Sequence, residues 1–228
     1  MKNQKLKNAL AILYTSISIL SFVIILIIPV TREWFKGLSA TQPYIMGFIK
    51  FALLATAGEL IAAYIANGKI VIPCKILLRF IIWGVIGVWI TLMMNVFKTA
   101  SAYMMVLDKL PGGTNTWIFA LYTSVLMNTT FGPTFMAVHK ISDKMLELSS
   151  QGEKVSLKNA VKGVDWSTFV SFTILKTVPF FWIPAHFITF LLPSEYQVIM
   201  AAALSIALGI ILSVGNRKKK TQEVQGEN

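Results

Sequence analysis

Four ionisable side chains lie inside stretches that are otherwise apolar, and their chemistry needs explaining first. Lys50 and Glu59 share one apolar stretch, and Lys176 and His186 share a later one. Even the lowest insertion scales assign about 2.5–3.5 kcal/mol to a charged Lys or Asp at the centre of a membrane helix. Such residues are therefore functional candidates, either as groups that handle ions, protons or solutes or as structural ion pairs.

The depths of these four residues form two matched levels. A rise of ~1.5 Å per residue places Glu59 and Lys176 roughly 12 and 14 Å from the inner ends of their apolar stretches. The same rise places Lys50 and His186 both about 9 Å below the outer surface. If the two stretches are facing helices, we expect Glu59 and Lys176 to form a coupled pair midway, with Lys50 and His186 near the outer mouth.

Each of these residues also has a structural explanation. Lys50 is shallow enough to snorkel to the outer interface. His186 could be a hydrogen-bonded packing residue, and a buried ion pair of Glu59 with Lys176 could serve folding alone. The sequence leaves these alternatives open.

Three prolines, Pro133, Pro179 and Pro184, interrupt the later apolar stretches. Each proline frees a carbonyl and kinks or breaks its helix. Freed backbone at membrane depth must face protein or water, and broken helices beside polar groups are common in transporters. The prolines are therefore candidate helix breaks beside a polar pathway.

The composition defines the elements that must position these residues. The chain has 228 residues, of which 55% are hydrophobic and 14% charged, and its mean hydropathy is +0.67. These values exclude an ordinary water-soluble globule. The apolar runs are continuous and about twenty residues long, which favours membrane-spanning helices over a barrel.

The sequence predicts an all-α, polytopic membrane helical bundle with about six transmembrane helices in one domain over residues 1–215. The predicted spans are 9–30, 44–67, 77–97, 116–138, 167–192 and 197–214. The fourth span carries a polar load that includes Asn128. Residues 140–165 are expected to be a solvated connector, or else to extend the fourth helix along the membrane surface. Residues 216–228 are expected to be a basic, disordered cytoplasmic tail.

Basic residues indicate the orientation of the bundle. Assigning the loops alternately to two sides places 15 basic residues inside and four outside. The inside set is Lys2, Lys5, Lys7, Lys69, Lys75, Arg79, Lys140, Lys144, Lys154, Lys158, Lys162, Arg217, Lys218, Lys219 and Lys220, and the outside set is Arg32, Lys36, Lys98 and Lys109. The positive-inside rule then predicts both termini on the cytoplasmic side. The net charge of +11 is thus largely a topology signal rather than a mark of nucleic-acid binding.

Signs of enzymatic chemistry are missing from the sequence. The single cysteine, Cys74, excludes an intrachain disulfide and a cysteine metal cluster. The sequence has no nucleotide-binding loop, HExxH motif or serine elbow. We therefore expect no enzyme activity, no cofactor, no metal site and no nucleic-acid partner.

Several segments occur in an order typical of one family. FALLATAGELIAAYIANGK carries Gly58 and Glu59 mid-helix, AYMMVLDKLPGG is similar to a WYxxLD stretch with a following proline-glycine turn, and NTTFGP precedes FFWIPAHFITFLLPSEYQV. Together, over about residues 44–213, they resemble the Mpv/PMP family of small peroxisomal and mitochondrial inner-membrane proteins. In that resemblance Glu59 takes the place of a family Asp and Asn128 that of a family glutamine, whereas Met127 replaces an acidic residue.

The resemblance implies a role in membrane passage and no particular reaction, because the family is linked to channel-like permeability and metabolite homeostasis. Family members are generally described with four spans. We therefore expect an integral membrane protein that forms or gates a small polar pathway for small solutes or ions. The alternative is a non-transport membrane scaffold or assembly/homeostasis factor whose buried charges serve helix packing.

The expected partners are the lipid bilayer and small solutes or ions, with homo-oligomer formation left open. The expected location is the inner (cytoplasmic) membrane of a bacterial cell, or a mitochondrial or peroxisomal membrane if the chain is eukaryotic.

Overall fold

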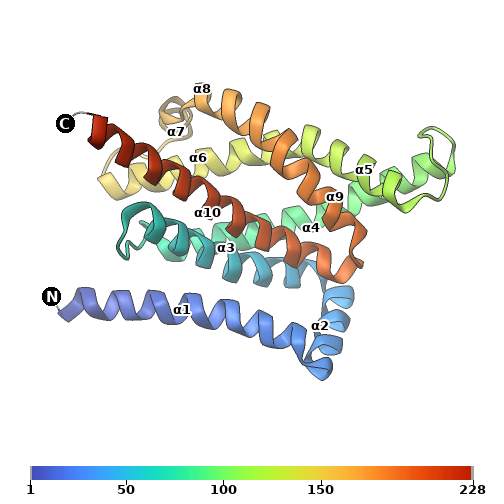
Figure 1. Cartoon of the computed structure of the whole chain (residues 1–228), viewed down its shortest axis with the longest axis horizontal. Helices are drawn as coiled ribbons and strands as arrows, with labels where there is room; N and C mark the ends of the chain where they lie inside the picture. Colours follow the sequence, from blue (N-terminus) through green and yellow to red (C-terminus); the bar gives the residue numbers. More distant parts are fainter. Residues whose placement is uncertain (1, 227–228) are drawn as a thin grey trace. The chain divides into compact units, whose positions relative to one another are not determined.

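The computed structural model describes the backbone of residues 2–226 and the side chains of residues 4–214, and this described part is helical without a strand (Figure 1). In chain order the helices are α1 (Lys2–Ile27), α2 (Pro29–Thr41), α3 (Pro43–Asn67), α4 (Ile76–Val106), α5 (Thr116–Leu126), η1 (Met127–Phe131), α6 (Gly132–Gln151), α7 (Leu157–Gly163), α8 (Trp166–Thr168), η2 (Phe169–Trp182), α9 (Ile183–Leu191) and α10 (Ser194–Gly226). Segments η1 and η2 are π-helices, which have wider turns than an α-helix.

The described chain contains five helical segments long and apolar enough to cross a membrane. They are Gln4–Ile27, Pro43–Asn67, Ile76–Val106, Trp166–Leu191 and Ser194–Val214. They correspond to five of the six predicted spans and confirm an all-α membrane helical bundle.

The fourth predicted span, 116–138, is not among the five. It is divided among α5, η1 and α6, and Asn128, Thr129 and Thr130 in η1 lower its hydropathy. The prediction of a solvated connector over 140–165 is likewise wrong in its first half. There α6 continues to Gln151 because Leu146 and Leu148 are buried, as the helix-extension alternative expected.

The helices form two compact units. The first, unit 1, contains residues 1–91 and 198–228, and the second, unit 2, contains residues 92–197. A single domain over residues 1–215 stays a prediction. The predicted disorder over 216–228 differs from the structure up to Gly226, where α10 continues through residues of high helix propensity such as Lys and Gln.

In unit 1, α1 packs on α3, and α2 lies across one end of both (Figure 1). The Tyr14 hydroxyl on α1 donates to the carbonyls of Ala52 and Leu53 on α3, at 3.1 and 3.0 Å. Pro29 and Pro43 each begin a helix, a position that tolerates proline because the first turn has no amide partner to lose. These contacts make α1, α2 and α3 one packed group.

Helices α3 and α4 approach each other backbone to backbone. A Cβ atom placed on Gly47 of α3 would lie 2.8 Å from the Gly87 carbonyl oxygen of α4, so neither position has room for a larger residue. Small residues at helix crossings permit this approach in membrane proteins. The crossing fixes which residues of α3 and α4 face each other.

In unit 2, α5 packs against α9, and the prolines lie inside a π-helix or directly after one. Pro133 is in the first turn of α6, directly after η1, and Pro184 is in the first turn of α9, directly after η2. Pro179 lies inside η2. A π-turn bonds residues five apart, so the chain accommodates the missing proline N–H within a widened helix. The predicted helix breaks are therefore widened turns, and the backbone stays helical.

Candidate functional site

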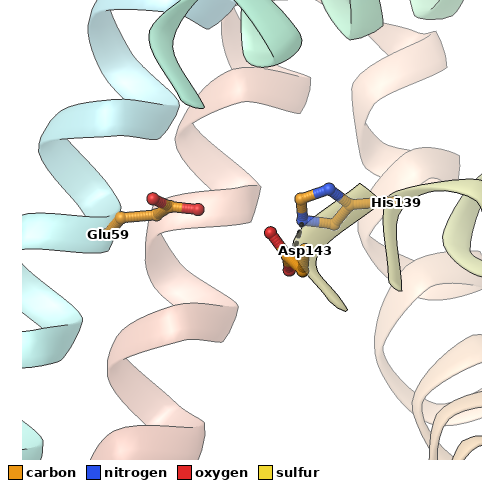
Figure 2. A group of neighbouring side chains, drawn as sticks. All are labelled: Glu59, His139 and Asp143. Carbon is orange, nitrogen blue, oxygen red and sulfur yellow. Dashed lines mark ion pairs between the residues drawn. The ribbon is translucent and has the colours of Figure 1, made fainter. Parts of the chain in front are cut away.

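Glu59 lies on α3 in unit 1, and its carboxylate is held from α4. Figure 2 shows this carboxylate projecting from its helix. Its Oε1 atom accepts from Arg79 Nη1 at 3.1 Å and from Trp83 Nε1 at 3.0 Å. We call these three residues the Glu59 clamp. The Glu59 and Arg79 side chains are 18% and 14% exposed, so the ion pair is largely removed from the surroundings.

Arg79 of the Glu59 clamp also bonds to the loop that connects α3 to α4. Arg79 Nε donates to the Cys74 carbonyl at 3.0 Å, which holds the end of the loop over 68–75 against the first turn of α4. Gly68, at φ 65°, ends α3 in the left-handed conformation that favours glycine. Arg79 therefore holds one carboxylate and one turn of backbone with the same guanidinium group, whose several N–H donors make this possible.

Sequence reasoning missed the partners of Glu59. Arg79 was counted as a loop charge although it falls inside the predicted span 77–97, and Trp83 was not considered. The available signal was their spacing, because residues four apart share a helix face. Lys176, the predicted partner, is exposed on η2 in unit 2, and its coupling to Glu59 stays a prediction.

Lys50 lies on α3 and is only 2% exposed. Its Nζ donates to Ser39 Oγ on α2 at 2.8 Å and lies 4.5 Å from the centroid of the Phe35 ring. An ammonium over an aromatic face is attracted by the ring's negative π cloud. The snorkelling interpretation is therefore wrong, because α2, in a region the sequence analysis treated as a loop, covers Lys50. The signal was again spacing, since Phe35 and Ser39 are four residues apart.

In unit 2 His186 of α9 is bonded to Asn128 of η1. The His186 Nδ1 and Asn128 Oδ1 atoms are 2.9 Å apart, and Asn128 Nδ2 donates to the Ser124 carbonyl at 2.8 Å. An amide oxygen can only accept, so this arrangement assigns a proton to His186 Nδ1. The Ser124 hydroxyl donates to the Ile183 carbonyl at 2.7 Å, which links α5 directly to α9.

This Asn128–His186 network, comprising Asn128, His186 and Ser124, is buried. Asn128 is 2% and His186 is 7% exposed, and the His186 ring stacks on Trp182 at a centroid distance of 5.3 Å. The geometry agrees with the packing explanation of His186. The pathway role predicted for the two residues stays a prediction.

The other histidine, His139, lies on α6 in unit 2. Its Nε2 is 3.6 Å from Asp143 Oδ2, one helical turn away, and Figure 2 marks this pair with a dashed line. When the imidazole is protonated, the two groups form an ion pair. The sequence analysis did not single out either residue, because both lie after the predicted end of the fourth span.

Two carboxylates outside the membrane spans are stabilised in their ionised form. The pKa of Glu147 is lowered because Lys144 Nζ donates to its Oε1 at 2.9 Å. The pKa of Asp165 is lowered by hydrogen bonds from Thr168, first from its side chain and then from its backbone N–H at 3.0 Å. The second pair caps α8 at the entrance to the span Trp166–Leu191.

The fold and these polar groups were compared with known proteins. No family model, no curated protein and no solved structure matches the chain. The function must therefore be argued from the chain's own residues.

Proposed function

We propose that this integral membrane protein is a scaffold or assembly factor whose intramembrane polar groups hold its own helices together. The observation that carries the proposal is that Glu59, Lys50 and His186 each bond to a side chain of another helix of the same unit. The contacts join α3 to α4, α2 to α3, and η1 to α9.

Lipid explains why such contacts stabilise the fold. A polar group in hydrocarbon has no water to bond with, so its partner must come from a neighbouring helix. Removing one member of a buried ion pair then leaves an uncompensated charge, which is strongly destabilising. Groups used in this way specify which helices pack together.

A double-mutant cycle tests the proposal. Glu59→Gln and Arg79→Gln are made singly and together in the full chain, and folded yield and unfolding temperature are measured in detergent. A packing role predicts that each single change lowers both quantities and that the double change recovers part of the loss. Additive losses, or stability unaffected by all three variants, would count against the proposal.

A second candidate function, the gating of a small polar pathway, is favoured by Lys176. This lysine is exposed although it lies within the membrane span Trp166–Leu191. An exposed charge at that depth is costly against lipid and is stabilised by water, as in a solute path. The resemblance to the Mpv/PMP family supports this candidate as well. The candidate function therefore includes the proposal that the chain is a member of that family.

Solute flux separates the two candidates. The full chain and its Lys176→Gln variant are reconstituted in liposomes, and efflux of small ions and neutral solutes is measured, with Lys140→Gln as a control for an exposed lysine on α6. Efflux that falls with Lys176→Gln alone supports the pathway and contradicts a purely structural role. Liposomes as tight as protein-free ones contradict the pathway.

A further inference from the structure

A groove runs between α1 and α3 on unit 1, with a volume of about 290 Å³. Its lining includes Ala11, Ile12 and Thr15 from α1 and Leu60, Ile61 and Tyr64 from α3. The volume is near the lower end of the range for small-molecule sites. The groove takes no part in the polar contacts described above.

Both walls of the groove belong to membrane spans. The lining residues of α1 fall within Gln4–Ile27 and those of α3 within Pro43–Asn67. Most of the lining side chains are apolar, and a groove in this position opens towards hydrocarbon. A flexible apolar chain is the ligand that matches such a wall and such surroundings.

One end of the groove is basic. Figure 1 shows that α1 and α3 run antiparallel, with Tyr14 of α1 bonded to Ala52 and Leu53 of α3, so the start of α1 lies beside the end of α3. Lys7 precedes the lining residue Ala11 by one helical turn on the same face of α1. Lys69 directly precedes Ile70, another lining residue, in the loop after α3.

We propose that this groove binds a glycerophospholipid with an anionic head group. One acyl chain lies along the apolar wall, and the phosphate lies at the end of the groove between the exposed ammonium groups of Lys7 and Lys69. Basic residues beside a membrane helix attract anionic lipids in this way. The assignment does not depend on whether the protein is a scaffold or forms a pathway.

Lipid titration of the purified full chain in detergent tests the site. Phosphatidylglycerol and phosphatidylcholine with the same acyl chains are added separately, and the bound lipids are counted by native mass spectrometry. We expect tighter binding of phosphatidylglycerol. We also expect its affinity to fall about fivefold for each of Lys7→Gln and Lys69→Gln, the factor that corresponds to ~1 kcal/mol per basic residue.

Lys109→Gln is the matched control. Lys109 is an exposed lysine in the loop after α4, in unit 2, and it does not line the groove. Equal binding of the two lipids, or an equal loss of affinity with Lys109→Gln, would overturn the proposal, because either result indicates general attraction to the basic surface.

A separate variant tests whether the acyl chain lies along the apolar wall of the groove. Ile61→Trp fills the groove, whereas Ile49→Trp adds the same side chain at an exposed position of α3 that does not line it. We expect only Ile61→Trp to lower phosphatidylglycerol binding. If both tryptophan variants bind the lipid as the wild type does, the acyl chain does not occupy the groove and the proposal fails. If Ile61→Trp does not fold, the lysine variants decide the outcome.

Discussion

The Glu59 clamp in unit 1 and the Asn128–His186 network in unit 2 each join two helices, with different chemistry. The Glu59 clamp uses a full ion pair and keeps 18% of the Glu59 side chain exposed. The Asn128–His186 network joins an amide, an imidazole and a hydroxyl, and Asn128 is only 2% exposed.

The difference shows how burial and charge are balanced in this protein. A charged pair has a large desolvation cost, which partial exposure reduces. A neutral network has a smaller cost and can be closed off fully if every donor and acceptor finds a partner. The two regions should therefore respond differently to the loss of a single side chain.

Arg79→Leu should have the largest effect, because it removes the ion pair with the Glu59 carboxylate and frees the turn at Cys74. We expect a loss of about 3 kcal/mol in the free energy of unfolding, the cost of breaking a largely buried pair. The measurement is unfolding in detergent by a folding-sensitive fluorescence signal. Arg79→Lys is the control and should keep part of this stability. A loss below that of the neutral network would reverse the comparison.

His186→Ala should cost less, about 2 kcal/mol, because it leaves the buried Asn128 oxygen without its hydrogen-bond partner. The same unfolding assay measures it. The matched control is His139→Ala, which removes the other histidine from a more exposed position on α6. If the two histidine variants were equally stable, the Asn128–His186 network would not be a structural link.

The Lys50 ammonium group is a third case, because this residue is less exposed than the charged side chains of the Glu59 clamp. Ser39→Ala removes the hydroxyl that accepts from its ammonium, and we expect a loss of about 1.5 kcal/mol, typical of a hydrogen bond to a charged group. Thr41→Ala, which removes an exposed hydroxyl from the same helix, is the control. An unchanged stability in Ser39→Ala would show that α2 is not held to α3 through this contact.

Asp165 is a carboxylate outside the membrane spans, and its removal should cause the smallest loss of stability in this comparison. Because the pKa of Asp165 is lowered in the folded protein, its contribution is present above the unfolded value of about 3.9 and is lost as the pH falls through the folded value. The unfolding midpoint of Asp165→Asn should lie slightly below that of the wild type at pH 7. The two midpoints should converge below about pH 4. A difference that persists in acid would exclude the carboxylate charge as its cause.

The sequence predicted most of the helices and membrane spans, but it did not predict which side chains bond to Glu59 and Lys50. Long apolar runs predicted the helix type and five of the spans, because length and hydropathy are local properties. The end of the fourth helix was missed because burial of Leu146 and Leu148 depends on tertiary packing. Depth arguments predicted a partner for Glu59 on a distant helix, whereas Arg79, twenty residues along the chain, forms an ion pair with it.

The same limit applies to Lys50. Its predicted depth suggested the outer interface, yet depth does not reveal a short helix that covers the side chain. Spacing on that helix, with Phe35 and Ser39 one turn apart, was the only sequence signal for it.

The contact of Gly47 with Gly87 has a consequence for motion within unit 1. Because two backbones touch there, α3 and α4 cannot slide or rotate past each other without separating, and slow collective motions must carry them as one rigid body. Helix α1 is held to α3 by side-chain contacts such as those of the Tyr14 hydroxyl, and only 17% of its most apolar 18-residue window is buried. Rearrangement in unit 1 should therefore occur by displacement of α1 from a fixed pair of helices, along the face that carries the groove.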